Sequence, residues 1–575
     1  MTSSLRDLLP FARGEVPSDL VIRGARVANV LSLEFEEVDV AVARGTIVGM
    51  GEGFEGREVL DARGSVLIPG LLDGHLHIES SCLTPSRFAE IVVPRGTTGV
   101  FADPHEIANV LGAAGVRGMA EASRGLPLDV FLGAPSCVPA SPFETCRVPL
   151  GAADLAGLFA DGTCQHLGEM MNYPGVVAGD REVWAKIAAA GDRPLTAHAP
   201  GLSGRALGAY ALSGCDGDHE STSLEEGREK LRRGFWVMMR GGSVAPDLEA
   251  LAPLLREDPA RAGRCMGVSD DVDVRTLLEE GHQDAKLRRL CARGVDPLAA
   301  LRCLTLSPAE YFRLPRRGAI APGWRADLAL VDSLETCRVH RVWKDGVLVA
   351  RDGRLCVSPD HPVPPALLDR GEPLPPLDRE RLRVPAAGRL LRVLGARPGS
   401  LLTENLLLPP RVEEGQVVPD PERDLVKLAV RERHTGSGRL GVGFVRGLGL
   451  RRGALGASVA HDAHNHIAAG ADDRSLFTAL RALEELGGGF VAAEGDRILA
   501  ALPLPVGGLM NPGPGEETAR LLEEVDRAVR GLGVEGLHPC MALSFLSLSV
   551  IPRLKLTDRG YVDLEGGGLL GLFED

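Results

Sequence analysis

The sequence predicts an α/β chain built around a (β/α)8 barrel. From residue 69 to about 315, short apolar runs alternate with stretches rich in Ala, Leu, Glu and Arg that suit helices. Eight of these runs are strand-like, which matches the strand number and the roughly 250 residues of such barrels. Polar residues cluster after the runs, where this fold builds its active face. The strand ends are expected near His77, Asp103, Pro135, Glu169, His198, His219, Arg240 and Asp270.

Strand-like segments flank the predicted barrel on both sides. Residues 19–68 alternate apolar and polar positions around the turn signals Arg44-Gly45 and Asp61-Ala62-Arg63-Gly64. Similar alternation returns within residues 316–355, at 318–320, 326–331 and 342–349. We expect residues 19–68 and 316–355 to form one small β-sandwich, with residues 69–315 as the catalytic barrel between them.

A further domain is expected after the barrel and its flanks. Residues 356–384 are rich in proline and charge, which predicts a partly extended linker. Residues 385–575 contain strand runs at 425–430 and 441–445 and a predicted helix from Ser475 to Leu486. This pattern indicates a separate C-terminal α+β domain.

Composition excludes several kinds of partner. The net charge of -14 argues against a nucleic-acid partner, because such binding needs a clustered basic footprint. The N-terminus lacks a signal-peptide pattern, and no run approaches the ~18 apolar residues of a membrane span. The 11 cysteines contain no Cys-x-x-Cys pair, which is typical of reduced, buried thiols. We therefore expect a cytoplasmic protein that acts on a small molecule, with no nucleic-acid or membrane partner. We also expect the chain to form a homo-oligomer.

Six residues at the predicted strand ends form a candidate set of metal ligands. His75 and His77 are spaced i, i+2, so an extended strand points both imidazoles to one side. Imidazole and carboxylate ligands suit zinc, iron or manganese, and Glu169 can bridge two divalent ions that share an activated water. Asp270 is placed to take a proton from that water and pass it to a leaving group. The six are His75, His77, Glu169, His198, His219 and Asp270.

Several longer stretches carry a resemblance to a known family. They are residues 69–81, 96–98, 102–112, 168–172, 198–204 and 218–221, and, past the linker, 460–465, 502–510 and 543–546. These stretches resemble the amidohydrolase superfamily and, within it, the adenine deaminase family. The resemblance covers nearly the whole chain. Ser269 and His466 depart from the family pattern, but neither departure removes a predicted ligand.

The resemblance implies an activity and a further site residue. It implies hydrolytic deamination of adenine to hypoxanthine and ammonia in purine salvage, on two divalent ions of manganese, iron or zinc. The ligands it implies are the same six residues. It also implies that Glu106, in Asp103-Pro104-His105-Glu106, lies beside the purine and shuttles a proton to a ring nitrogen.

Other interpretations stay open at this point. The chain could be an amidohydrolase for another aminopurine or a cyclic amide, or a barrel scaffold without catalysis; the complete ligand set argues against a scaffold. Asp103, Pro104 and His105 could merely shape a turn. We expect His166 to pack in the core and Asp271 to cap a helix.

Three histidines of the C-terminal domain have two possible roles. They are His461, His464 and His538. His461 and His464 are three residues apart, close enough to converge in one helical turn or a loop. They could be satisfied polar groups at a domain interface. Our hypothesis is that this domain covers the open face of the barrel and shields adenine from water.

Overall fold

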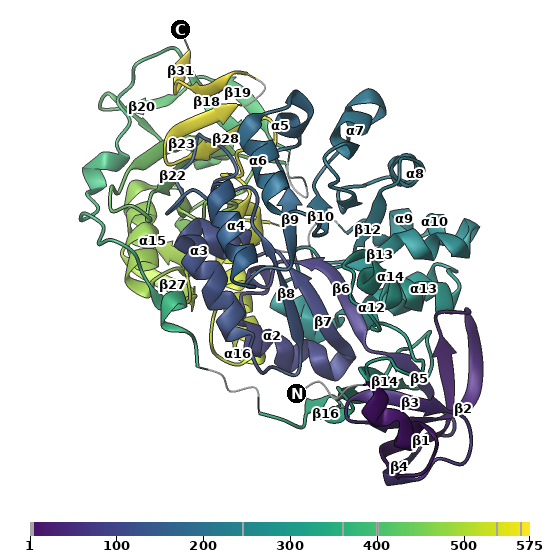
Figure 1. Cartoon of the computed structure of the whole chain (residues 1–575). Coiled ribbons are helices and arrows are strands. Elements are labelled where there is room, and N and C mark those ends of the chain that lie inside the picture. The colour runs from purple at the N-terminus through teal and green to yellow at the C-terminus, as the bar shows by residue number, and fades with distance from the viewer. Residues whose placement is uncertain are drawn as a thin grey trace.

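The computed structural model describes residues 5–243, 246–358, 362–397, 400, 402–535, 539–563 and 566–574. Figure 1 shows the barrel at the centre, the flanking sheet below it and the C-terminal domain against its other side. Among the described residues, none of the helices combines the length and the apolar character needed to cross a membrane.

Eight parallel strands form the predicted barrel. Their order in space follows their order in the chain, from β6 to β13. A bridge between Leu76 and Asp270 brings the last strand back to the first, so the sheet is nearly closed. The strands end where the apolar runs end, which confirms the predicted fold class. They are β6 (Leu71–Leu76), β7 (Thr97–Ala102), β8 (Asp129–Ala134), β9 (His166–Met170), β10 (Leu195–Ala197), β11 (Gly217–Asp218), β12 (Trp236–Arg240) and β13 (Cys265–Val268).

Helices follow the barrel strands and cover their outer side. Short polar side chains start several of them: Asp180 accepts hydrogen bonds from the first turn of α6, and Asp296 does so for α13. The longest barrel helix, α3, begins at His105, directly after the loop that leaves β7. The main helices are α2 (Pro85–Val92), α3 (His105–Ala122), α4 (Ala152–Ala160), α6 (Arg181–Ala189), α7 (Gly204–Ala211), α8 (Leu224–Arg232), α11 (Val274–Glu279), α12 (Gln283–Ala292), α13 (Pro297–Cys303) and α14 (Leu306–Tyr311).

The two flanks of the barrel form one sheet of nine strands. Strand β5 pairs with β1 from the N-terminal flank and with β14 from the later flank, so the sheet joins both ends of the barrel segment. Two details of the expectation were wrong: residues 318–320 are not a strand, and residues 342–349 span two strands that turn at Asp345-Gly346. The strands are β1 (Ser18–Asn29), β2 (Glu34–Ala43), β3 (Thr46–Met50), β4 (Gly56–Asp61), β5 (Val66–Pro69), β14 (Leu328–Val331), β15 (Val339–Lys344), β16 (Val347–Arg351) and β17 (Arg354–Leu355).

The C-terminal part contains a second nine-stranded sheet, packed by helices. Its central strands include β22 (Leu425–Arg431), β23 (Leu440–Arg446), β24 (Ala454–Ala457) and β25 (His466–Gly470). Asp472 caps α15 (Asp473–Leu486), which ends at Gly487 in the left-handed region, with φ of 77°. The predicted helix and the two predicted strands are confirmed.

The C-terminal domain packs directly against the barrel. Arg275 of α11 forms an ion pair of 2.5 Å with Asp526 of α16 (Gly515–Gly531). The Thr145 hydroxyl donates to Asp558 at 2.7 Å. Leu367, on the segment that links the domains, is fully buried beside α3. These contacts hold the two parts as neighbours across a polar and apolar interface (Figure 1).

Candidate metal centre

The six predicted ligand residues converge at the carboxyl end of the barrel. His75 lies on β6 and Glu169 on β9. His77, His198 and His219 directly follow their strands, and Asp270 is the second residue after β13. Five of the six side chains are buried and His198 is half-buried. Parallel strands that all end at one rim therefore bring together residues as far apart in sequence as His75 and Asp270.

The carboxylate of Glu169 lies between two groups of imidazoles. Its Oε1 is 3.5 Å from Nε2 of His77. Its Oε2 is 2.7 Å from Nδ1 of His198 and 3.1 Å from Nε2 of His219. The backbone N–H of Glu169 donates to Asp103 Oδ2 at 2.7 Å, which fixes the residue at the strand end. One carboxylate thus faces ligand atoms from three other strands.

The carboxylate of Asp270 lies close to both His75 and His77. Its Oδ1 is 3.2 Å from Nε2 of His77 and 3.6 Å from Nε2 of His75. The Asp270 N–H donates to the carbonyl of His75 at 2.9 Å, which ties the two strand ends together. Its backbone has φ of 57°, in the left-handed region that Asp tolerates better than most residues.

The donor set fits a divalent metal ion. Ligand atoms of His75, His77 and Glu169 lie within 4.8 Å of one another, and so do those of Glu169, His198 and His219. The Nε2 of His75 is buried with no hydrogen-bond partner among the described residues. His77 Nδ1 lies 2.9 Å from the Asp103 carbonyl, so Nδ1 carries the proton and Nε2 is left as a free ligand atom. Mixed imidazole and carboxylate ligands suit zinc, iron and manganese.

Charge also favours a cation at this position. Burial alone raises the pKa of Glu169, but the charge of His219 and a hydrogen bond from His198 lower it well below its usual range. Burial lowers the pKa of His198, but the neighbouring Glu220 and Glu169 raise it to about 9. A metal ion competes with the protons that these imidazoles would otherwise hold, so its affinity rises with pH.

A buried polar network holds the strand ends that carry the ligands. Asp73 Oδ1 accepts from the N–H groups of His75 and Ser269, at 3.2 and 3.1 Å. Lys286 donates to the Ser269 hydroxyl at 2.8 Å, and His282 lies 2.9 Å from Asp73. The sequence analysis missed this network, because Ser269, His282 and Lys286 lie about 200 positions after Asp73 in the chain.

The C-terminal domain covers the ligand cluster and completes a small pocket. The pocket has a volume of about 90 Å³, well below the roughly 300–1,000 Å³ of pockets for drug-sized ligands. The pocket therefore has room only for a small molecule. The walls from the C-terminal domain are His461, Asp462, Phe545, Leu548, Val550 and Ile551.

Glu106 lies where the barrel meets this cover. Its Oε1 is 3.3 Å from the Ser80 hydroxyl and 3.4 Å from Nδ1 of His461. Its Oε2 is 3.9 Å from Nε2 of His464. Burial is the largest cause of a raised pKa at Glu106, so this carboxyl group can hold a proton. His538 lies outside the described residues.

The tautomer of His464 follows from its second nitrogen. His464 Nδ1 accepts from the N–H of Ala460 at 3.1 Å, so the neutral ring carries its proton on Nε2. Burial holds the pKa of His464 well below its ordinary value, which keeps the ring neutral. The Nε2–H of His464 therefore faces Glu106 Oε2 at 3.9 Å, beyond hydrogen-bond distance, and the neutral ring has no free nitrogen for a metal.

Other predicted residues have mixed outcomes. His166 packs in the core as expected, with its ring 4.9 Å from that of Phe312. The cap expected at Asp271 was wrong: Asp273 accepts from the N–H of Thr276 and caps α11, because it is the residue directly before that helix. Asp271 instead accepts from the Ser80 hydroxyl at 2.5 Å and lines the pocket.

His105 shapes more than a turn. It begins α3, and its Nδ1 lies 3.5 Å from Oε1 of Glu169. The sequence analysis did not identify Glu220 and Arg240 as pocket residues. Arg240 Nη1 donates to Glu220 Oε1 at 2.6 Å and to Asp270 Oδ2 at 3.4 Å. Both were detectable, since Glu220 directly follows His219 and Arg240 ends β12.

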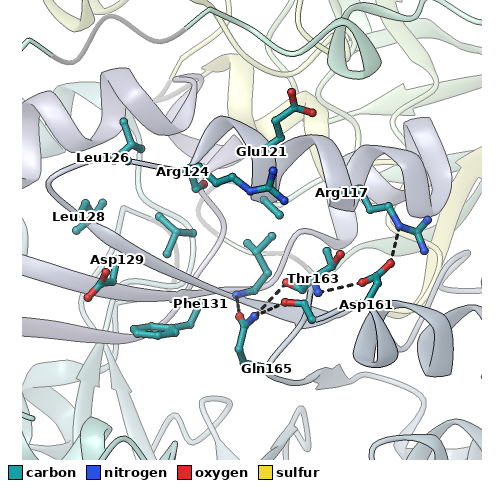
Figure 2. A pocket seen from close by; sticks show the side chains of 16 residues that line it. Arg117, Glu121, Arg124, Leu126, Leu128, Asp129, Phe131, Asp161, Thr163 and Gln165 are labelled. Atoms are coloured by element: carbon teal, nitrogen blue, oxygen red, sulfur yellow. Dashed lines mark hydrogen bonds and ion pairs between the residues drawn. The ribbon is translucent and has the colours of Figure 1, made fainter. Parts of the chain in front are cut away.

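A second hollow lies on the outside of the barrel (Figure 2). It is bordered by α3 and by the segments that enter β8 and β9, at the opposite end of the strands from the ligands. Arg117 and Asp161 form an ion pair of 2.8 Å there. None of the six ligand residues lines it, so it is not the candidate site.

Comparison with known proteins gave matches to both halves of the chain. Residues 66–349 match the model of the amidohydrolase family, and residues 400–567 match that of the adenine deaminase C-terminal domain. An adenine deaminase of Nitratidesulfovibrio vulgaris is 47% identical over 97% of both chains. One of Oleidesulfovibrio alaskensis is 45% identical over 98% of both chains. Among solved structures, enamidase has 17% identity and a TM-score of 0.46, covering 58% of this chain and 96% of its own.

Proposed function

The chain belongs to the adenine deaminase family, and from that premise we propose that it hydrolyses adenine to hypoxanthine and ammonia. The observation that carries the proposal is full-length similarity, which includes both the barrel and the domain that covers its mouth. The small pocket beside a metal-binding donor set supports it independently. A scaffold role is not favoured, because all six ligand positions are occupied by metal-binding residue types.

We propose two divalent ions of manganese, iron or zinc, held by His75, His77, Glu169, His198, His219 and Asp270. The position of Glu169 between two imidazole groups supports a bridging role for its carboxylate. When bound, such ions act as Lewis acids and lower the pKa of a water molecule to near neutrality.

The protein groups account for the proton transfers. Asp270 accepts one proton as water adds to C6 of adenine, and Glu106 gives a proton to ring nitrogen N1. Asp270 then protonates the amino group, the C6–N bond breaks and ammonia leaves. The second proton of the water restores Glu106 as the C6 carbonyl forms. The raised pKa of Glu106, caused chiefly by burial, supports its role as the acid.

The cellular setting is also a proposal. All 11 cysteines are unpaired thiols in the structure, which supports a reducing compartment such as the cytoplasm. We retain the expectation of a homo-oligomer, which sedimentation would test.

Ammonia release from a panel of bases tests the function. The chelated protein, reloaded with manganese, iron or zinc, is assayed with adenine, guanine, 2,6-diaminopurine, adenosine and a cyclic amide. We expect adenine to be the best substrate, with full activity at two metal equivalents per chain. Faster turnover of another aminopurine or of the cyclic amide would overturn the assignment. Glu106→Gln should lose most of the rate at unchanged metal content.

A further inference from the structure

The C-terminal domain brings two unsatisfied polar atoms to the pocket. Asp462 Oδ2 and His461 Nε2 are buried and have no hydrogen-bond partner among the described residues. Both side chains line the pocket, and each is only 4% exposed. A buried polar atom without a partner costs roughly 1–3 kcal/mol, and more if it is charged. A pocket ligand that donates hydrogen bonds would remove this cost.

The other polar side-chain atoms of these two residues face ionisable neighbours at 3.4–4.0 Å. Asp462 Oδ1 is 3.8 Å from Nδ1 of His461 and 4.0 Å from Nε2 of His105. His461 Nδ1 also faces Glu106, at 3.4 Å. The His461 ring stacks on Phe545, with centroids 4.7 Å apart and planes 4° from parallel. The His461 ring is therefore fixed by its neighbours, and Asp462 Oδ2 is left for a donor in the pocket.

Asp462 lies beyond the metal ligands, on the side of the pocket that the C-terminal domain forms. The ring of His105 separates the two groups: its Nδ1 faces Glu169 at 3.5 Å and its Nε2 faces Asp462. A purine with C6 at the ligand cluster would extend its five-membered ring toward the C-terminal domain. The remaining wall, formed by Leu548, Val550 and Ile551, is apolar and offers no side-chain acceptor.

We propose that Asp462 accepts a hydrogen bond from the ring N–H of the five-membered ring, at N7 or N9, and thereby selects the free base. This inference rests on the proposed adenine deaminase function. Adenosine carries its sugar on N9 and has no ring N–H, so it would leave Asp462 Oδ2 unsatisfied. Specificity against nucleosides would then come from the C-terminal domain, whereas the barrel supplies the reaction centre.

A cycle that combines one residue change with one ligand change tests this role. Wild type and Asp462→Asn are compared for adenine, 7-methyladenine and 9-methyladenine, both in turnover and as competitors in equilibrium binding. A hydrogen bond to a charged group predicts that Asp462→Asn loses about 10- to 100-fold in affinity and kcat/KM for adenine. The methylated bases lack the ring N–H, so they should lose less than about 3-fold.

The matched control is Asp563→Asn, which alters another buried carboxylate of the same domain outside the pocket. It should leave the ratio between adenine and the methylated bases unchanged. Metal content and thermal unfolding check that each variant folds. Equal losses for all three bases, or no loss for adenine, would overturn the role of Asp462. If wild type binds adenine with the expected discrimination but releases no ammonia, the proposed function fails and the recognition role stands.

Discussion

Asp270→Asn is the sharpest test of the proton transfers. The change keeps the shape of the side chain but removes the charge that faces His77 at 3.2 Å and His75 at 3.6 Å. It also removes the acid–base function. The hydrogen bond from Arg240 to Oδ2 can persist, because an Asn carbonyl oxygen accepts in the same place.

The expected loss is about 10²- to 10⁴-fold in kcat, the usual effect of removing a general acid or base. That loss equals about 3–5 kcal/mol of activation free energy. Affinity for adenine should change far less, because Asp270 acts on the water and the leaving group. Steady-state kinetics and metal analysis of the same samples separate lost chemistry from lost metal.

Asp247→Asn is the matched control. Asp247 accepts from the same Arg240 at 2.6 Å but does not line the pocket. It should keep kcat within about 3-fold of wild type, as expected for a change away from the reacting atoms. An Asp270→Asn protein with full metal content and near-normal kcat would refute the proposed role.

Three further predictions address the metal, the cover and pH. Glu169→Gln should lower metal content and rate together, as measured by elemental analysis and ammonia release; full occupancy with full activity would exclude the bridging model. A chain cut within residues 356–384 should still bind metal but deaminate adenine at least about 10²-fold more slowly, since an open site loses the electrostatic benefit of enclosure; equal activity of a soluble, metal-loaded barrel would contradict this. Burial, and then the charge of Asp462, raise the pKa of Glu144 from its ordinary 4.5 to about 8. The folded state therefore binds the extra proton between these values, so this group lowers stability as pH rises from 4.5 to 8. Glu144→Gln should raise stability at pH 9 by up to about 5 kcal/mol and change it little below pH 4.5, which melting curves at both ends would check against the exposed control Glu422→Gln.

Local patterns in the sequence were enough to find the barrel and to locate the six candidate ligands. An apolar run fixes a buried strand, and the residue after it must lie at the rim where all parallel strands end. His198, His219 and Asp270 could therefore be grouped with His75 without knowledge of any contact. The structure brings these residues together because all the parallel strands of the barrel end at the same rim.

Contacts between domains could not be found this way. Asp462 and Phe545 reach the pocket only because the C-terminal domain docks on the barrel, through pairs such as Arg275 with Asp526. No periodicity in either segment encodes that docking. The missed turn at Asp345-Gly346 is different, since Asp-Gly is a strong hairpin signal.

The sheet shared by both flanks constrains the order in which parts of the protein can fold during synthesis. β5 lies between β1 and β14, so the two flanks cannot pair into one sheet until β14, which ends at residue 331, has been synthesised. By then all six candidate ligand positions, the last at Asp270, have been synthesised. The pocket wall ends only at Ile551. Because domains fold one after another during synthesis, a nascent chain can assemble its ion-binding residues long before it can enclose a substrate.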